Sequence, residues 1–283
     1  MKRLSIIFIF CVTALCGCLK EQTPEEYVQH LYIDGRIEQG AGAVVMITTN
    51  KAYDDLFNVE ELRDNVVRWA KVTLSDSQQS EVLTGRVDAD YPTRFIYTSN
   101  EIIGREGETY TLRVDYSGRW WSATTTIPPI SSVISIDREW INDSLYRIRV
   151  ELPPCNDARM IECALGKTRY YRPALLGIVK GSSSLENRQL TINRPLNYLD
   201  VDNYMTSFHR DDTVRLRVST MPPFGYEYWS CWENVEVNSL NPIFPAEHNP
   251  PTNISNDGRG IWCGYGSVYP SFSTSDFVDE ITQ

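Results

Sequence analysis

The chain has 283 residues and a formal net charge of −10 at pH 7. An acidic surface of this kind argues against nucleic acid and against an anionic membrane face as binding partners. The length is enough for two domains of ordinary size.

The N-terminus has the plan of a secretory signal peptide. Lys2 and Arg3 form a short positive region, and the apolar segment Leu4–Leu15 is too short to span a bilayer comfortably as a permanent helix. The run Leu15-Cys16-Gly17-Cys18 resembles the bacterial lipobox, in which an aliphatic and a small residue precede a cysteine. The resemblance implies that Cys18 carries acyl chains such as palmitate, which anchor a domain on a membrane. The alternative is an ordinary signal peptide that ends in cysteine.

Residues 18–26 are polar and acidic, and we expect them to form a tether. No Asp follows Cys18 directly, so an inner-membrane retention signal is not evident. Lys20 and Glu21 resemble the short charged run that directs lipoproteins to the outer surface in bacteria that display them there. We therefore expect a lipid-anchored outer-membrane protein exposed at the cell surface, with the periplasmic leaflet as the alternative.

Short runs with period-two alternation of apolar residues recur between turn residues, which predicts an all-β fold. The runs are HLYIDGRI from His30, VVRWAKVTLSD from Val66, TYTLRVDY from Thr109, RWWSATTTI from Arg119, SLYRIRVEL from Ser144 and TVRLRVST from Thr213.

Two segments depart from this alternation. Apolar residues in 56–66 recur at helical spacing, so we expect a short helix or helical insertion there. In PPFGYEYWSCWENVEV, residues 222–237, the two prolines suit the start of a helix. One stripe of this helix would carry Phe224, Tyr228, Trp232 and Val235, and we expect the stripe to pack against a sheet.

The best domain boundary is TTTIPPISS, residues 124–132, because Pro128 and Pro129 cannot lie in a central strand and the alternation restarts after them. The predicted division is a signal peptide at 1–17, the tether at 18–26, an N-terminal β-sandwich at 27–130, and a C-terminal β-rich domain at 131–283 with one or two short helices.

Four cysteines remain beyond the lipobox: Cys155, Cys163, Cys231 and Cys263. An even number in an exported protein suggests disulfides, and the pairs Cys155 with Cys163 and Cys231 with Cys263 are one of three connectivities. Buried free thiols are the alternative. No CxxC spacing occurs and the three histidines lie far apart in sequence, so we expect no structural zinc site.

Catalytic motifs are absent from the sequence. It contains no GxSxG elbow, no HExxH and no Walker A loop. The glycines in GRGIWCGYG, residues 258–266, do not have the GxGxxG spacing of a dinucleotide loop. We predict no catalytic residue, metal or cofactor, although carboxylates distant in sequence could still meet.

Aromatic residues are the remaining candidates for contact with an unknown small ligand. The four principal ones are Trp120, Trp121, Trp262 and Tyr265, and the wider set adds Tyr170, Tyr171, Trp229 and Trp232. Successive residues of a strand point to opposite faces, so we expect one of the two adjacent tryptophans to be exposed. The alternative for each is a place in the core. We expect Ile261 and Trp262 to anchor the C-terminal stretch in the second domain.

Three pieces in order, VVRWAKVTLSD, IIGREGETYTLRVDYSGRWWSATTTIPP and NPIFPAEHNPPTNISNDGRGIWCGYG, resemble the domain-of-unknown-function 4249 (DUF4249) family of bacterial outer-membrane lipoproteins. The matching positions are Thr73, Asp76, Gly107–Leu112, Thr126–Pro128, Asn253, Ile254, Gly258, Gly260, Ile261 and Trp262. The resemblance implies an N-terminal sandwich akin to transthyretin-like or carboxypeptidase-regulatory-like domains. It also implies association with TonB-dependent transporters, and it supplies no catalytic residue.

These observations predict a non-catalytic, surface-exposed outer-membrane lipoprotein that serves a TonB-dependent transporter by capturing a ligand or forming part of its lid. One alternative is a structural adhesin or pilus-like subunit. A second is a hydrolase with a scattered carboxylate site.

Overall fold

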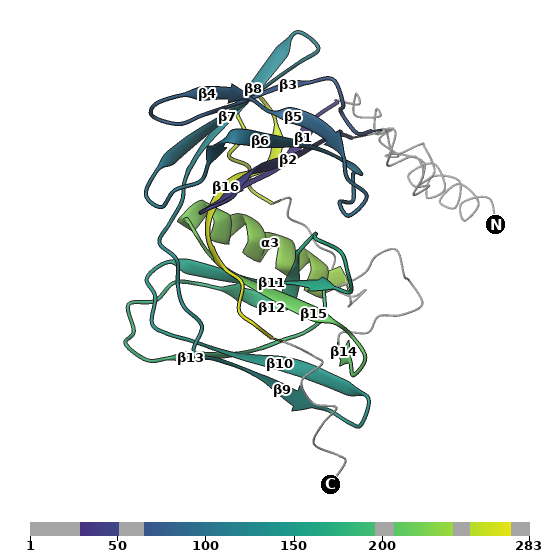
Figure 1. The fold of residues 1–283 in the computed structure, drawn as a ribbon, viewed down its shortest axis with the longest axis vertical. Helices are drawn as coiled ribbons and strands as arrows, with labels where there is room; N and C mark the ends of the chain where they lie inside the picture. Colours follow the sequence, from purple (N-terminus) through teal and green to yellow (C-terminus); the bar gives the residue numbers. More distant parts are fainter. Residues whose placement is uncertain (1–28, 51–64, 196–206, 240–249, 273–283) are drawn as a thin grey trace, which may run out of the picture.

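The computed structural model describes residues 29–50, 65–195, 207–239 and 250–272 (Figure 1). Within these ranges the chain consists of β-strands and one helix, which confirms the predicted all-β fold. The signal peptide, Cys18, the tether and nearly all of the predicted helix at 56–66 lie outside the described residues. The described part contains no helix whose length and apolar character would suffice to cross a membrane.

Two halves follow one another along the chain. The first contains β1 (Leu31–Glu38), β2 (Gly42–Thr49), β3 (Lys71–Ser75), β4 (Ser80–Val82), β5 (Thr84–Val87), β6 (Phe95–Ile103), β7 (Thr109–Tyr116) and β8 (Arg119–Thr126). The second contains β9 (Ser135–Trp140), β10 (Leu145–Leu152), β11 (Ala158–Leu165), β12 (Arg172–Val179), β13 (Arg188–Ile192), β14 (Phe208–His209), β15 (Val214–Met221), α3 (Pro223–Ser239) and β16 (Arg259–Val268).

The first half is a sandwich. The sheet β4-β3-β7-β8 faces strands β1, β2, β6 and β5, and one apolar cluster fills the space between them. Alternation places Tyr110, Leu112 and Val114 of β7 in this cluster, while Arg113 on the same strand is exposed. The period-two pattern therefore predicted both the strand and its buried face.

The second half is built on both faces of strands β11 and β15. A small sheet, β13-β10-β14 with β9 beside β10, packs on one face through the cluster that contains Ile148, Val150 and Leu216. Helix α3 covers the other face, where Phe224 and Tyr228 of the predicted stripe pack against Met160 and neighbouring residues. The predicted helix at 222–237 is confirmed.

The period-two pattern did not predict strand β11, because this strand is covered on both faces. Seven of its eight residues are buried, with Met160 beneath α3 and Ile161 and Cys163 in the cluster opposite. A strand covered on both faces has no polar side, so its sequence, ARMIECAL, carries no period-two signal.

Strand β16 joins the two halves into one sheet with the order β12-β11-β15-β16-β1-β2-β6-β5 (Figure 1). Its first part pairs in parallel with β1, with Ile33 opposite Gly260, and its last part pairs antiparallel with β15, with Val218 opposite Val268. The predicted division at residue 130 thus falls within a chain whose main sheet is continuous. The separate folding of the two predicted domains stays a prediction.

The C-terminal stretch anchors differently from our expectation. Trp262 lies in the core of the first half, and Ile261 lies beneath α3. Adjacent residues of a strand point to opposite faces, so this strand inserts one side chain into each core. The indole Nε1 of Trp262 donates to the Tyr110 carbonyl oxygen at 3.0 Å, and the Asn253 side chain bonds the backbone N–H and C=O of Trp262.

Gly260 is required by the approach of β16 to β1. Its φ is +97°, and a Cβ at this position would lie 2.0 Å from the carbonyl oxygen of Ile33. No other residue fits both the dihedral angle and the contact.

We expect Gly260→Ala to lower the free energy of unfolding by more than Gly118→Ala. Gly118 has a similar positive φ of +74° but has no atom within 4 Å of the Cβ position. The control therefore measures the backbone cost alone, about 1–2 kcal/mol. Urea denaturation of both variants measures the difference, and equal losses would contradict the close contact between β16 and β1.

Candidate functional site

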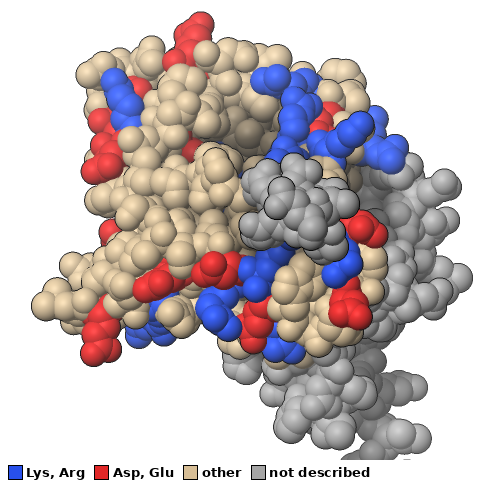
Figure 2. Space-filling view, turned by 60° about the horizontal axis from the view of Figure 1, so that its bottom comes forward, with Lys and Arg blue, Asp and Glu red and all other residues tan. Residues whose placement is uncertain are grey.

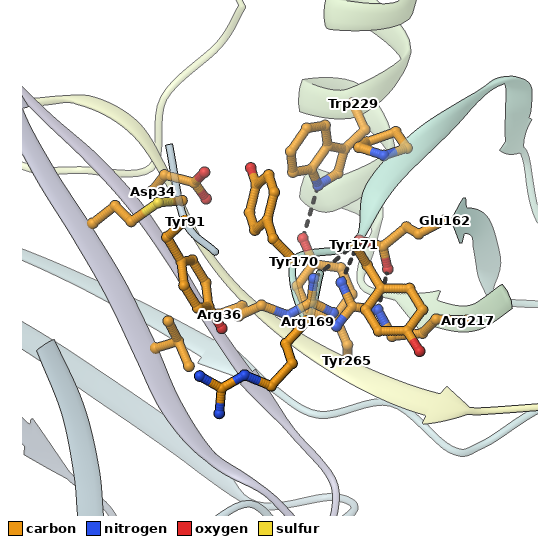
Figure 3. A pocket seen from close by; sticks show the side chains of 13 residues that line it. Asp34, Arg36, Tyr91, Glu162, Arg169, Tyr170, Tyr171, Arg217, Trp229 and Tyr265 are labelled. Carbon is orange, nitrogen blue, oxygen red and sulfur yellow. Dashed lines mark hydrogen bonds and ion pairs between the residues drawn. The ribbon is translucent and has the colours of Figure 1, made fainter. Parts of the chain in front are cut away.

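A small cavity of about 40 Å³ lies at the junction of the two halves, beside α3 (Figure 3). Its walls combine charged and aromatic side chains from both halves. They come from β1 (Asp34, Arg36), β2 (Val44, Met46), the β5–β6 loop (Tyr91), β11 (Glu162), the segment before and at the start of β12 (Arg169, Tyr170, Tyr171, Pro173), β15 (Arg217), α3 (Trp229) and β16 (Tyr265).

The charged residues reach the cavity because of strand alternation. On β1, Ile33 and Ile37 enter the core of the first half, so Asp34, Arg36 and Glu38 lie on the opposite face of the sheet. The continuous sheet brings this face next to the helix-covered face of β11 and β15. The side chains of one polar face thereby meet across the junction.

Four of these side chains form a buried ion network. Arg217 contacts Glu162 at 2.5 and 2.7 Å and Glu38 at 2.8 Å, which ties the second half to the first. Arg36 Nη1 donates to Glu162 at 3.0 Å, and Arg36 Nε lies 2.8 Å from Glu38 without hydrogen-bond alignment. Each charge is therefore matched by at least one opposite charge.

The network holds its members in their charged forms. Burial alone would raise the pKa of Glu38, but Arg36 and Arg217 outweigh it and lower that pKa to about 2. Burial acts in the same way on Glu162, and the same two guanidinium groups again lower the pKa. Neither carboxyl is therefore a proton donor near neutral pH.

Asp34 stands apart from this network. No hydrogen bond or ion pair joins its carboxyl to another described side chain, although it lines the same cavity. Burial raises its pKa to about 6, Arg36 opposes the shift and Glu162 reinforces it. Figure 3 shows the Asp34 carboxyl pointing toward the ring of Tyr170.

Aromatic rings form the rest of the wall. Tyr91 and Tyr170 lie 5.3 Å apart between ring centroids, and Trp229 Nε1 donates to the Tyr265 hydroxyl at 2.7 Å (Figure 3). Arg36 lies 4.5 Å above the Tyr265 ring, a distance typical of a cation–π contact. The cavity thus already places one cation against an aromatic face.

An outer cleft of about 290 Å³ adjoins the cavity and shares Val44, Tyr91 and Arg169 with it. Arg169 crosses between the halves here, with 3.0 Å contacts to Asp88 and Asp90. Because these ion pairs are largely exposed, they contribute little to stability. They lie where the cleft meets the cavity.

The sequence of the whole site falls inside one family. The model of the domain of unknown function DUF4249 matches residues 20–268. The chain belongs to the DUF4249 family. The match spans both halves, α3 and all of β16, so every residue that lines the cavity lies within the DUF4249 domain. A comparison with curated proteins found no match.

The four principal aromatic candidates of the DUF4249 domain lie in different places, and only two of them are exposed or line the cavity. Trp121 and Trp262 are 4% and 0% exposed and lie in the core of the first half, so neither can contact a ligand as we had expected. Trp120 is 44% exposed on β8, with the Arg113 guanidinium 5.0 Å above its ring. Tyr265 is buried against α3 but lines the cavity.

Sequence reasoning named Tyr170 and Trp229 among the wider aromatic candidates but missed the charged residues. Asp34 and Arg36 lie in a run that predicts a strand, and charges on the polar face of a strand are ordinarily solvated. Arg217 carried no signal either, because in TVRLRVST it occupies the face that alternation predicts to be polar, although the structure buries it.

None of the four cysteines of the DUF4249 domain is in a disulfide, so the predicted pairings are not formed. Cys163 lies five residues into the extended strand β11, which carries it roughly 16 Å beyond the strand's start at 3.3 Å per residue. Cys155 is bridged to Ser182 and Arg159 is opposite Val179, so Cys155 lies beyond the start of β11 on the side away from Cys163. The separation exceeds the reach of a disulfide. Cys263 lies beside Gly225 of α3, and Gly225 precedes Cys231 by nearly two helical turns. Cys263 and Cys231 therefore lie at different levels of the helix.

Among the described residues, no three His, Cys, Asp or Glu side chains gather into a metal-ligand set. On the face shown in Figure 2, several basic side chains gather at the upper right, acidic and basic side chains mix along the lower part, and neutral residues cover most of the remainder.

We expect Glu162→Gln to lower the free energy of unfolding by about 3–5 kcal/mol, because it leaves Arg36 and Arg217 buried with one carboxylate between them. Urea denaturation measures the change. The control is Glu106→Gln on the exposed β6–β7 loop, for which we expect a change of about 0.5 kcal/mol or less. Similar small effects at both positions would contradict a stabilising role for the network.

Acid should weaken the DUF4249 domain through Glu38. Its folded-state pKa of about 2 lies below the ordinary 4.5, so its stabilisation is present above about pH 4.5 and is lost as the pH falls toward 2. We expect unfolding free energies measured between about pH 6 and about pH 2.5 to fall more steeply for the wild type than for Glu38→Gln. Parallel curves would show that Glu38 is not held ionised by the fold.

Proposed function

We propose that this DUF4249 protein is a non-catalytic, surface-exposed outer-membrane lipoprotein, anchored through Cys18, that captures a small ligand for a TonB-dependent transporter. The cavity at the junction carries the proposal. Its walls come from both halves and include three members of the ion network, and a wider cleft adjoins it. Small-ligand sites favour concave positions between structural units, where a few polar groups converge among aromatic side chains.

The hydrolase alternative receives less support from the same cavity. General acid–base catalysis by two carboxyls requires one of them to release or take up a proton near neutral pH. Glu38 and Glu162 are held ionised by two arginines, which leaves Asp34, with a pKa of about 6, as the one carboxyl at the cavity that titrates near neutral pH. A two-carboxyl mechanism would need a second carboxylate that is not engaged with arginine.

The anchor and the partner come from the lipobox and from family resemblance, which Cys18 and the match over residues 20–268 support. The anchor precedes the domain, so the tether would hold the cavity close to the membrane surface that contains the transporter. The adhesin alternative uses the same anchor but requires chains that polymerise.

We expect the native lipoprotein to co-purify with an outer-membrane barrel after crosslinking and extraction in mild detergent. The matched control is Cys18→Ser, which removes the acylated thiol and leaves the DUF4249 domain unchanged. Incorporation of a palmitate analogue into the wild type but not the variant checks the anchor.

Three outcomes separate the proposals. Capture of a barrel by the wild type and not by Cys18→Ser supports the transporter role. Recovery of the wild type alone after crosslinking would contradict it. Recovery of ladders of this chain itself would favour the adhesin alternative.

A further inference from the structure

Asp34 is the carboxyl of the cavity wall that has no ionic partner among the described residues. The three arginines of the wall are each engaged with other carboxylates, Arg36 and Arg217 with Glu38 and Glu162, and Arg169 with Asp88 and Asp90. The charge of Asp34 is therefore left without a counter-ion.

The groups that face Asp34 from the surrounding elements do not neutralise it. Arg36 on the same strand is engaged with Glu162, which itself adds negative charge near Asp34. Tyr170 before β12 and Tyr228 on α3 have raised pKa values, through burial first and through Asp34 second. Both phenols thus stay protonated and neutral at physiological pH.

Aromatic faces next to Asp34 suit a cation. The Asp34 carboxyl points toward Tyr170 (Figure 3), and the ring of Tyr170 lies 5.3 Å from that of Tyr91 with the planes at 56°. The fold already sets cations on rings nearby, with Arg217 lying 4.6 Å above Tyr171. Ring faces and a carboxylate together are the pattern that recognises ammonium groups.

The available space limits which cation fits. A cavity needs about 10–15 Å³ of this kind of volume to hold one water molecule, so the cavity of about 40 Å³ has room for a small polar head group and not for a whole ligand. The outer cleft of about 290 Å³ has room for the body of a small ligand, and Val44 and Ile96 give it an apolar wall. Tyr91 and Arg169 border both spaces.

We propose that the inner cavity binds the protonated primary amine of a small ligand, with Asp34 as its counter-ion and the ligand body in the outer cleft. This inference rests on the proposed capture function and names the ligand class. An ammonium group gives Asp34 a counter-ion and supplies hydrogen-bond donors to the one carboxyl of the wall that lacks a partner among the described residues.

The test is isothermal titration of the full-length lipoprotein in detergent with n-butylamine, and with 1-butanol as the neutral analogue. We expect saturable binding of n-butylamine at about pH 7.5 and none of 1-butanol. Asp34→Asn should weaken binding at least roughly ten-fold, the loss expected when a buried charge pair loses one partner. The control Asp143→Asn, on the exposed β9–β10 turn, should bind as the wild type does.

Two further measurements separate binding from folding. The melting temperature of Asp34→Asn should equal or exceed that of the wild type at neutral pH, because the substitution removes a half-buried charge without an ionic partner. The affinity of the wild type should fall by about ten-fold between about pH 7.5 and about pH 5, as Asp34 becomes protonated, and the variant should show no such fall.

Equal affinity of wild type and Asp34→Asn, or a large loss of stability in the variant, would overturn the assignment of Asp34 as the counter-ion. Saturable binding of sodium or potassium that excludes n-butylamine would overturn the amine and leave a metal cation as the occupant. If no cation binds while a barrel still co-purifies with the native protein, this inference fails and the transporter role stands.

Discussion

The parallel pairing of β16 with β1 is the contact on which the rest of the structure depends. It brings residues 259–265 back to a strand more than two hundred positions earlier and makes one sheet of strands from both halves. The other strands of each half could keep their order without this pairing. The junction, the ion network and the cavity could not form without it, because each contains side chains from both halves.

The close approach of the two strands explains the glycine-rich C-terminal signature. Gly260 lies against the carbonyl oxygen of Ile33, and Gly35 on β1 leaves room for the ring of Trp262. These glycines remove side chains at positions where backbone and indole must meet, which allows Trp262 to fill the core of the first half. Asn253 then satisfies the backbone groups of Trp262.

The ion network gives the junction a defined geometry. Two guanidinium groups and two carboxylates from β1, β11 and β15 meet away from solvent, and their mutual contacts offset the cost of burying them. Asp34 shares the same face without sharing a partner. A carboxylate kept without an ionic partner in an aromatic cavity is the feature on which we base the proposed binding site.

The sequence by itself determined the strands with one solvent-facing side, the helix α3 and the family. Runs such as TYTLRVDY and SLYRIRVEL alternate because one face meets a core and the other meets water, and this contrast is local. Strand β11 lacks the contrast and escaped prediction. The tertiary structure alone decided that the polar face of β1 is also covered, by residues of the second half at the junction. Strand pairing uses backbone groups that nearly every residue carries. The identities of Asp34, Arg36 and Glu162 therefore do not indicate which distant strand lies beside their own.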